Sequence, residues 1–287
     1  MNWLIFTIIS IFFRAVYGVS TKVLSSNVKV SPATVSVIFS TFATLLTLII
    51  SPLIGGISFK EFRSVWLLAM VVVIAISSGN ILYYKGIKSL DSSTTQIAFS
   101  SILIWGTLFS ITFLNSNFSS RQIVGIILLL LAIIFVQFKK GVNLLKKGVL
   151  YIILSALIFA IFQISTAELS KSISAATYLL TAYLGTTIVT GILYAKTIRK
   201  DLFLLKNRML QTSKVMLFSS ITSLIHFSFA YFAYRSAPDS GVVVVLLTSQ
   251  VIIAVILSII FLKERDRIGR KLVAGLLAVL AGFLIKG

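Results

Sequence analysis

The sequence contains no cysteine, one histidine and only seven acidic residues among 287. Without cysteine the chain has no disulfides, thiolate metal sites or cysteine nucleophiles. The single imidazole and the scattered carboxylates offer no recognisable metal-ligand spacing, so we expect neither a metal site nor a cofactor. A P-loop and the Gly-x-Ser-x-Gly and His-Glu-x-x-His motifs are also missing. We therefore predict that the chain is not an enzyme.

Charged residues are scarce in this chain. They make up 11% of the sequence, whereas a typical soluble domain has about 25%. Hydrophobic residues make up 58% and the mean hydropathy is +1.06, which predicts an integral, multi-pass protein of the cell (plasma) membrane. The net charge of +19 comes mostly from short gaps between apolar runs, as is typical of loops that face an anionic membrane surface. We expect membrane lipids and a small-molecule substrate as partners, and no nucleic acid; the oligomeric state stays open.

Long apolar runs fill the rest of the chain. A membrane-spanning helix needs about 20 mostly apolar residues, and the runs lack the strict alternation of a transmembrane β-strand. The predicted fold class is therefore an all-α integral membrane protein with ten transmembrane helices. We place them at approximately 3–25, 33–54, 65–84, 94–114, 122–138, 149–169, 175–195, 215–234, 241–262 and 272–286.

The two halves of the sequence resemble each other. Ser20-Thr21 corresponds to Ser165-Thr166 at an offset of 145, and an offset of 148 relates three further pairs: Tyr83 and Tyr231, Asp91 and Asp239, Ser101 and Ser249. We interpret residues 1–140 and 148–287 as two repeats of five helices. Because five is odd, the second repeat must enter the membrane upside down. Inverted repeats with a binding site at their interface are characteristic of secondary transporters.

Several short motifs are similar to the EamA-type, ten-helix branch of the drug/metabolite transporter superfamily. They are Phe159-Ala160 in the sixth segment, and Leu262-Lys263-Glu264-Arg265 followed by Gly275 and Gly282. The first repeat departs from the pattern, with Arg14-Ala15 and Leu114-Asn115-Ser116-Asn117 at the matching positions. The resemblance implies a carrier built from two five-helix repeats and does not specify its substrate.

Arg14 lies near the middle of the first apolar segment and is the foremost candidate for a substrate ligand. A permanently charged group at that depth is costly unless it meets water, a carboxylate or an anionic ligand. Other polar and aromatic residues within the segments complete the predicted cavity, although each alone could serve helix packing. They are Asn80, Tyr83, Tyr84, Trp105, Gln163, His226, Tyr231 and Gln250. Lys22 and Glu168 are predicted either to form an ion pair across the repeat axis or to lie separately at the membrane interface.

The preferred hypothesis is a secondary transporter that moves a small metabolite or drug-like compound, anionic or zwitterionic and amino-acid-like, by alternating access. A flippase for lipid-linked substrates and a non-transporting membrane scaffold are the alternatives. The loops after odd-numbered segments hold 18 Lys and Arg, and the remaining loops with the C-terminus hold six. The positive-inside rule then places both termini outside, whereas the family resemblance implies termini inside; we favour the charge count.

Overall fold

The computed structural model describes residues 2–27, 30–90, 95, 98–137, 147–205, 209–261 and 268–286, with some side chains in these ranges left aside. The described chain is all-helical, as predicted. The first half contains α1 (Asn2–Asn27), α2 (Pro32–Ile50), the short 3-10 helix η1 (Ser51–Ile54), α3 (Phe62–Ser89), α5 (Ile102–Phe113) and α6 (Ser120–Gln137). The second half contains α7 (Lys147–Leu169), α8 (Ala175–Leu193), α9 (Ala195–Leu205), α10 (Met209–Ser236), α11 (Ser240–Leu247), α12 (Gln250–Phe261) and α13 (Ile268–Lys286).

The second helix of each half starts with the same local structure. The hydroxyl of Ser31 accepts a hydrogen bond from the backbone N–H of Thr34 (3.3 Å) at the start of α2. The hydroxyl of Ser174 accepts one from the N–H of Thr177 (3.1 Å) at the start of α8. Serine is a favoured N-cap because its oxygen satisfies an N–H group that the helix leaves free. The matching caps support a duplicated unit.

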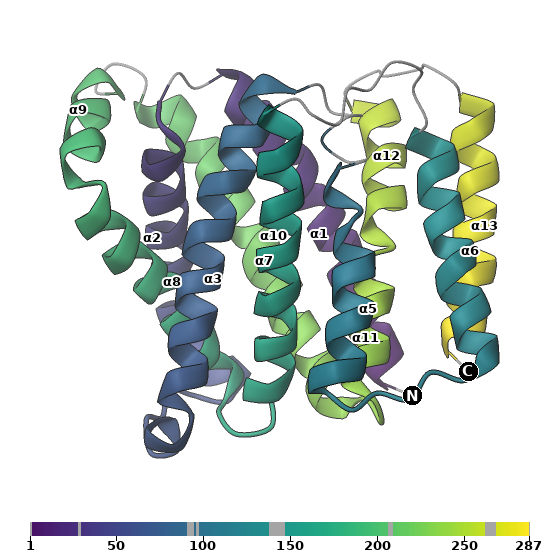
Figure 1. Cartoon of the computed structure of the whole chain (residues 1–287). Helices are drawn as coiled ribbons and strands as arrows, with labels where there is room; N and C mark the ends of the chain where they lie inside the picture. Colours follow the sequence, from purple (N-terminus) through teal and green to yellow (C-terminus); the bar gives the residue numbers. More distant parts are fainter. Residues whose placement is uncertain are drawn as a thin grey trace.

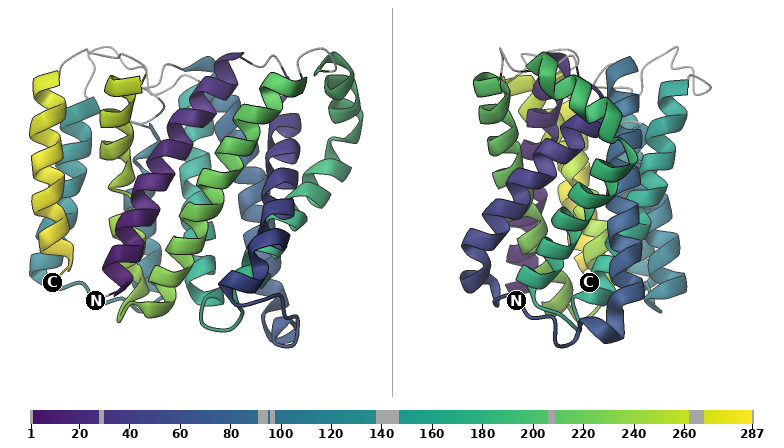
Figure 2. Two further views of the ribbon diagram at one scale, coloured as in Figure 1. Left: turned by 180° about the vertical axis from the view of Figure 1, so that it is seen from behind. Right: turned by 90° about the vertical axis from the view of Figure 1, so that its left-hand side faces the viewer.

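The two halves run in opposite directions through the bundle. The chain termini lie at one end of the molecule; α1 rises from that end, and α7 descends towards it (Figures 1 and 2). The most extensive contacts between helices join the two halves, since α1 packs along α10 and α3 packs along α7. The α2–α8 and α6–α13 pairs likewise each join one helix from either half. This arrangement confirms the predicted inverted duplication.

The helix lengths and surface suit a bilayer. Six helices are long and apolar enough to cross a membrane, and three shorter apolar stretches accompany them in the part of the chain that the structure describes. Large apolar side chains are exposed along the outer helices, including Ile49, Phe113 and Leu276, whose exposed fractions are 73%, 68% and 68%. A water-soluble protein rarely exposes so much contiguous apolar surface.

The fourth and ninth predicted spans differ from the prediction because both are interrupted. The predicted ninth helix is two helices, α11 and α12, separated by a turn at Thr248 and Ser249, and α5 begins only at Ile102. At these turns Ser101 donates to the carbonyl of Ala98 (2.8 Å), and Ser249 donates to that of Leu246 (2.7 Å). Serine hydroxyls that bond a carbonyl three residues back compete with the regular helical ladder. The two breaks lie at positions that the 148-residue offset relates.

Helix α9 was not predicted from the sequence, since the predicted segments 175–195 and 215–234 leave the residues between them unassigned. It is an amphipathic helix that follows α8 directly and packs against α2. Its polar composition hides it from a search for apolar runs.

Candidate functional site

Arg14 on α1 lies at the centre of the candidate site, inside the bundle. Its Nη1 atom lies 3.5 Å from Nε2 of His226 on α10. Its guanidinium carbon lies 5.9 Å from the ring centroid of Tyr17, 5.5 Å from that of Phe159 and 5.9 Å from that of Phe227. Aromatic faces attract cations through the ring quadrupole. Arg14 is thus held by one long hydrogen bond and three rings.

The hydrogen bonds of His226 define its protonation. The Ser10 hydroxyl donates to the carbonyl oxygen of His226 (3.1 Å), and Nδ1 of the ring lies 2.7 Å from that hydroxyl and 3.1 Å from the carbonyl oxygen of Ser10. Because the Ser10 carbonyl can only accept, this network assigns the ring proton to Nδ1. The lone pair of Nε2 then faces Arg14, so His226 acts as a neutral hydrogen-bond acceptor for the guanidinium.

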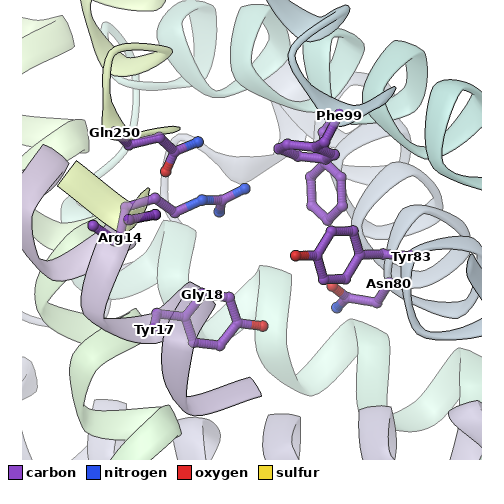
Figure 3. Close-up of a pocket in the computed structure, with 10 residues that line it drawn as sticks. Arg14, Tyr17, Gly18, Asn80, Tyr83, Phe99 and Gln250 are labelled. Carbon is purple, nitrogen blue, oxygen red and sulfur yellow. The ribbon is translucent and has the colours of Figure 1, made fainter. Parts of the chain in front are cut away.

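Two chambers meet at Arg14. Figure 3 shows Arg14 and Gln250 reaching across the first chamber towards Tyr83, Asn80 and Phe99. The first is lined by Arg14, Ala15, Tyr17, Gly18, Asn80, Tyr83, Phe99, Phe159, Gln250 and Ala254. The second is lined by Arg14, Phe159, Phe162, Gln163, Thr166, His226, Phe227, Ala230, Tyr234 and Leu247.

The repeats relate these chambers to each other. Arg14 and Phe159 line both chambers, are 145 residues apart and contact each other, as expected for equivalent residues beside a pseudo-twofold axis. The same offset takes Tyr17 and Gly18 of the first chamber to Phe162 and Gln163 of the second. The α1 residues that line the first chamber run from Arg14 to Gly18, and the α7 residues that line the second run from Phe159 to Thr166. Since α1 leads away from the terminal end and α7 towards it (Figure 1), the two chambers extend in opposite directions.

Both helix breaks border the chambers. Phe99 precedes the break before α5 and lines the first chamber, and its repeat equivalent Leu247 precedes the break before α12 and lines the second. Gln250 is the first residue of α12 and also lines the first chamber. Interrupted helices near the membrane midplane are a common way to build transporter binding sites.

The structure brings six of the nine predicted cavity residues to the chambers. Arg14, Asn80, Tyr83 and Gln250 line the first, and Gln163 and His226 join Arg14 in the second. The Gln163 side-chain oxygen is buried and has no hydrogen-bond partner among the described residues. It therefore offers a free acceptor within the second chamber.

The other three predicted cavity residues line neither chamber. The Tyr84 hydroxyl lies 3.4 Å from that of Tyr17. Trp105 packs against the hydrophobic core and stacks on Phe109. Tyr231 is fully buried and donates to the carbonyl oxygen of Ile173. These three side chains contact other parts of the bundle and not the chambers.

Lys22 and Glu168 are not brought together. The Lys22 side chain lies outside the described residues, and Glu168 forms a surface ion pair with Lys171 (2.6 Å). The neighbours of these two residues contact different parts of α10. Ser20, close to Lys22 in sequence, contacts Ser219, whereas Ser170, close to Glu168, contacts Tyr231. Twelve helical residues span about 18 Å.

Sequence reasoning missed the aromatic part of the site, Tyr17, Phe99 and Phe159. Tyr17 had a usable signal, since it lies three residues after Arg14 and so on the same helix face. Phe159 also had a signal, since the motif comparison already matched it to Arg14, whereas nothing distinguishes Phe99 among the 22 phenylalanines as a cavity residue. Among the described residues, no cluster of three or more His, Asp or Glu could hold a metal ion. The geometry suits non-covalent binding of an anion beside an aromatic group.

Comparisons with known proteins agree with this architecture. A model described as the EamA-like transporter family matches residues 1–138 and 146–286. A solved structure described only as "Crystal structure of protein" covers 98% of this chain and 94% of its own, with a TM-score of 0.75 and 11% identity, and therefore shows a shared fold alone. No curated protein matches the sequence. Because the family model covers nearly the whole chain, the protein belongs to the EamA-like transporter family of membrane carriers.

Proposed function

We propose that the protein is a secondary carrier for a small anionic or zwitterionic compound with an apolar part, moved across the plasma membrane by alternating access. The observation that carries this proposal is Arg14, a cation at the junction of two chambers with no ion-pair partner among the described residues. The one ion pair in that part of the chain is Lys171–Glu168, at the surface.

The chemistry of the chambers supports an anionic ligand group. A carboxylate or phosphate beside Arg14 would neutralise a charge that is otherwise costly inside the membrane, and it could accept two parallel hydrogen bonds from the guanidinium. The free oxygen of Gln163 suits an ammonium or hydroxyl donor on the same compound. Phe159, Phe99 and Tyr17 would contact its apolar part.

The symmetry of the chambers supports alternating access. Each chamber extends from the Arg14–Phe159 pair towards a different end of the molecule, and the repeats that line them are inverted copies. An exchange of conformation between the repeats would then open one chamber as it closes the other, while Arg14 stays at the junction.

The experiment is a substrate panel with matched variants. Purified protein is screened for thermal stabilisation by small carboxylates, phosphates, amino acids and cations, and the stabilising compounds are tested for uptake into proteoliposomes. Arg14→Lys keeps the charge without the planar fork and should weaken binding, whereas Arg14→Ala should nearly abolish it. Arg63→Ala, at an exposed position outside both chambers, is the control. Normal anion uptake by a folded Arg14→Ala variant would refute the proposal, as would uptake restricted to cations.

A further inference from the structure

Helix α9 carries a basic face on its outer side. Lys196, Arg199 and Lys200 are all exposed. At 100° per residue they lie within about 100° of arc on one face of the helix. Phe203 lies in the middle of the same arc and is 80% exposed. The helix is at the outer edge of the bundle, near the end opposite the termini (Figure 1).

The acidic residue of α9 faces the other way. Asp201 is buried against the start of α2, where its carboxylate accepts hydrogen bonds from the backbone N–H of Ser31 (2.7 Å) and the hydroxyl of Thr34 (2.7 Å). Burial raises the pKa of Asp201, but the hydrogen bonds from Ser31 and Thr34 lower it by a larger amount. The net pKa therefore lies below the usual value. The carboxylate fixes α9 to the bundle and leaves its outer face purely cationic.

Apolar side chains continue this face towards the hydrocarbon region. Ile192 and Leu193, at the end of α8, are 73% and 71% exposed. An exposed run of apolar residues followed by a cationic face with one protruding aromatic ring is the pattern of a segment at the boundary between acyl chains and headgroups. The positive charges then lie where anionic headgroups would meet them.

We propose that α9 is a binding site for anionic phospholipid, with Lys196, Arg199 and Lys200 contacting the headgroup phosphate and Phe203 inserted beside the acyl chains. An anionic lipid is the ligand that complements this face, because the outer side of α9 combines three cations with an apolar ring and has no exposed carboxylate. A free phosphate compound would use the cations and leave Phe203 in contact with water.

The test measures lipid binding to the full chain in neutral detergent, by native mass spectrometry and thermal unfolding, during titration with phosphatidylglycerol or phosphatidylcholine. Phosphatidylglycerol should bind and raise the unfolding temperature, and phosphatidylcholine should do so far less. The triple variant Lys196→Gln/Arg199→Gln/Lys200→Gln should bind phosphatidylglycerol about a hundredfold more weakly, since each basic residue near an anionic surface contributes about fivefold.

The control removes the same charge elsewhere. Lys60→Gln/Arg63→Gln/Arg121→Gln changes three exposed basic residues outside α9 and should keep wild-type lipid affinity. Phe203→Ser should weaken phosphatidylglycerol binding while leaving the charge intact. Equal losses in both triple variants would overturn the proposal, and so would stabilisation by glycerol 3-phosphate alone to the same extent as by the lipid. Because binding is measured without transport, the result is independent of the proposed carrier function.

Discussion

Replacing Arg14 by methionine should leave the protein as stable as the wild type, although it removes the central charge of the site. The guanidinium is held by one hydrogen bond at 3.5 Å and three ring faces at 5.5 to 5.9 Å. Each cation–π contact contributes about 0.5–1 kcal/mol, and a hydrogen bond of this kind about 1 kcal/mol. Together they stabilise the arginine by about 2.5–4 kcal/mol.

The opposing cost has a similar size. Placing an arginine at the centre of a transmembrane helix costs about 2.5–3.5 kcal/mol on insertion scales. The two contributions nearly cancel, so Arg14→Met should change the free energy of unfolding by no more than about 1 kcal/mol. An arginine paired with a buried carboxylate behaves differently, because removing one partner of such a pair costs about 3–5 kcal/mol.

Reversible unfolding of the purified protein in mixed micelles measures the change in the free energy of unfolding. A second assay measures how far anions raise the unfolding temperature. Arg14→Met should unfold like the wild type and lose its response to anions. Tyr231→Phe gives the scale of a structural loss, since it leaves a buried carbonyl without its donor and should cost about 1–3 kcal/mol. A loss of 3 kcal/mol or more for Arg14→Met would refute the reasoning and show that Arg14 stabilises the fold.

Three further predictions concern packing, pH and orientation. A Cβ atom at Gly86 would lie 2.5 Å from the side chain of Ile152, so Gly86→Ala should lower stability by about 1–3 kcal/mol, and the double variant with Ile152→Ala should lose less than the sum of the single changes. The pKa of Asp201 is below its usual 3.8, so its contribution to stability is present above about pH 4 and is lost as the pH falls through the lowered pKa. Asp201→Asn should therefore destabilise the protein at pH 7, and chemical unfolding of this variant should show a smaller loss of stability at acid pH than the wild type. In this cysteine-free chain, a membrane-impermeant maleimide added to intact cells should label Glu61→Cys and not Thr197→Cys, and the opposite pattern would reverse the orientation that the charge count predicts.

The fold was largely predictable because a bilayer constrains composition as well as structure. Apolar runs of the required length give the helices, and their odd number per repeat gives the inversion. The interruptions at Ser101 and Ser249 were not predicted, since a serine inside an apolar run barely changes its mean hydropathy. The breaks show in the backbone, where the N–H groups of Ser101 and Ser249 bond the carbonyls of Ala98 and Leu246, three residues back, in place of the α-helical pattern. The 148-residue offset had paired the two serines without revealing these breaks.

The site was predictable where residue chemistry alone gives the signal. Arg14 stands out because a charge in an apolar segment is costly wherever its side chain points. Aromatic residues gave no such signal: Tyr83 lines a chamber and its neighbour Tyr84 does not, because successive residues on a helix point about 100° apart. Which of the two faces the axis depends on how α3 packs against its neighbours.

The difference between the repeats places the proposed chemistry on the symmetry axis. Equivalent residues beside a twofold axis contact each other, so two arginines at positions 14 and 159 would repel, and two phenylalanines would leave no ligand for an anion. The chain has one of each, with the guanidinium carbon 5.5 Å from the ring centroid. His226, the neutral acceptor for Arg14, corresponds at the 148-residue offset to Ser78, which bonds its own helix. The bundle thus keeps the inverted scaffold that alternating access would need and places an asymmetric cation and its acceptor where, in the proposed cycle, both chambers would use the same charge in turn.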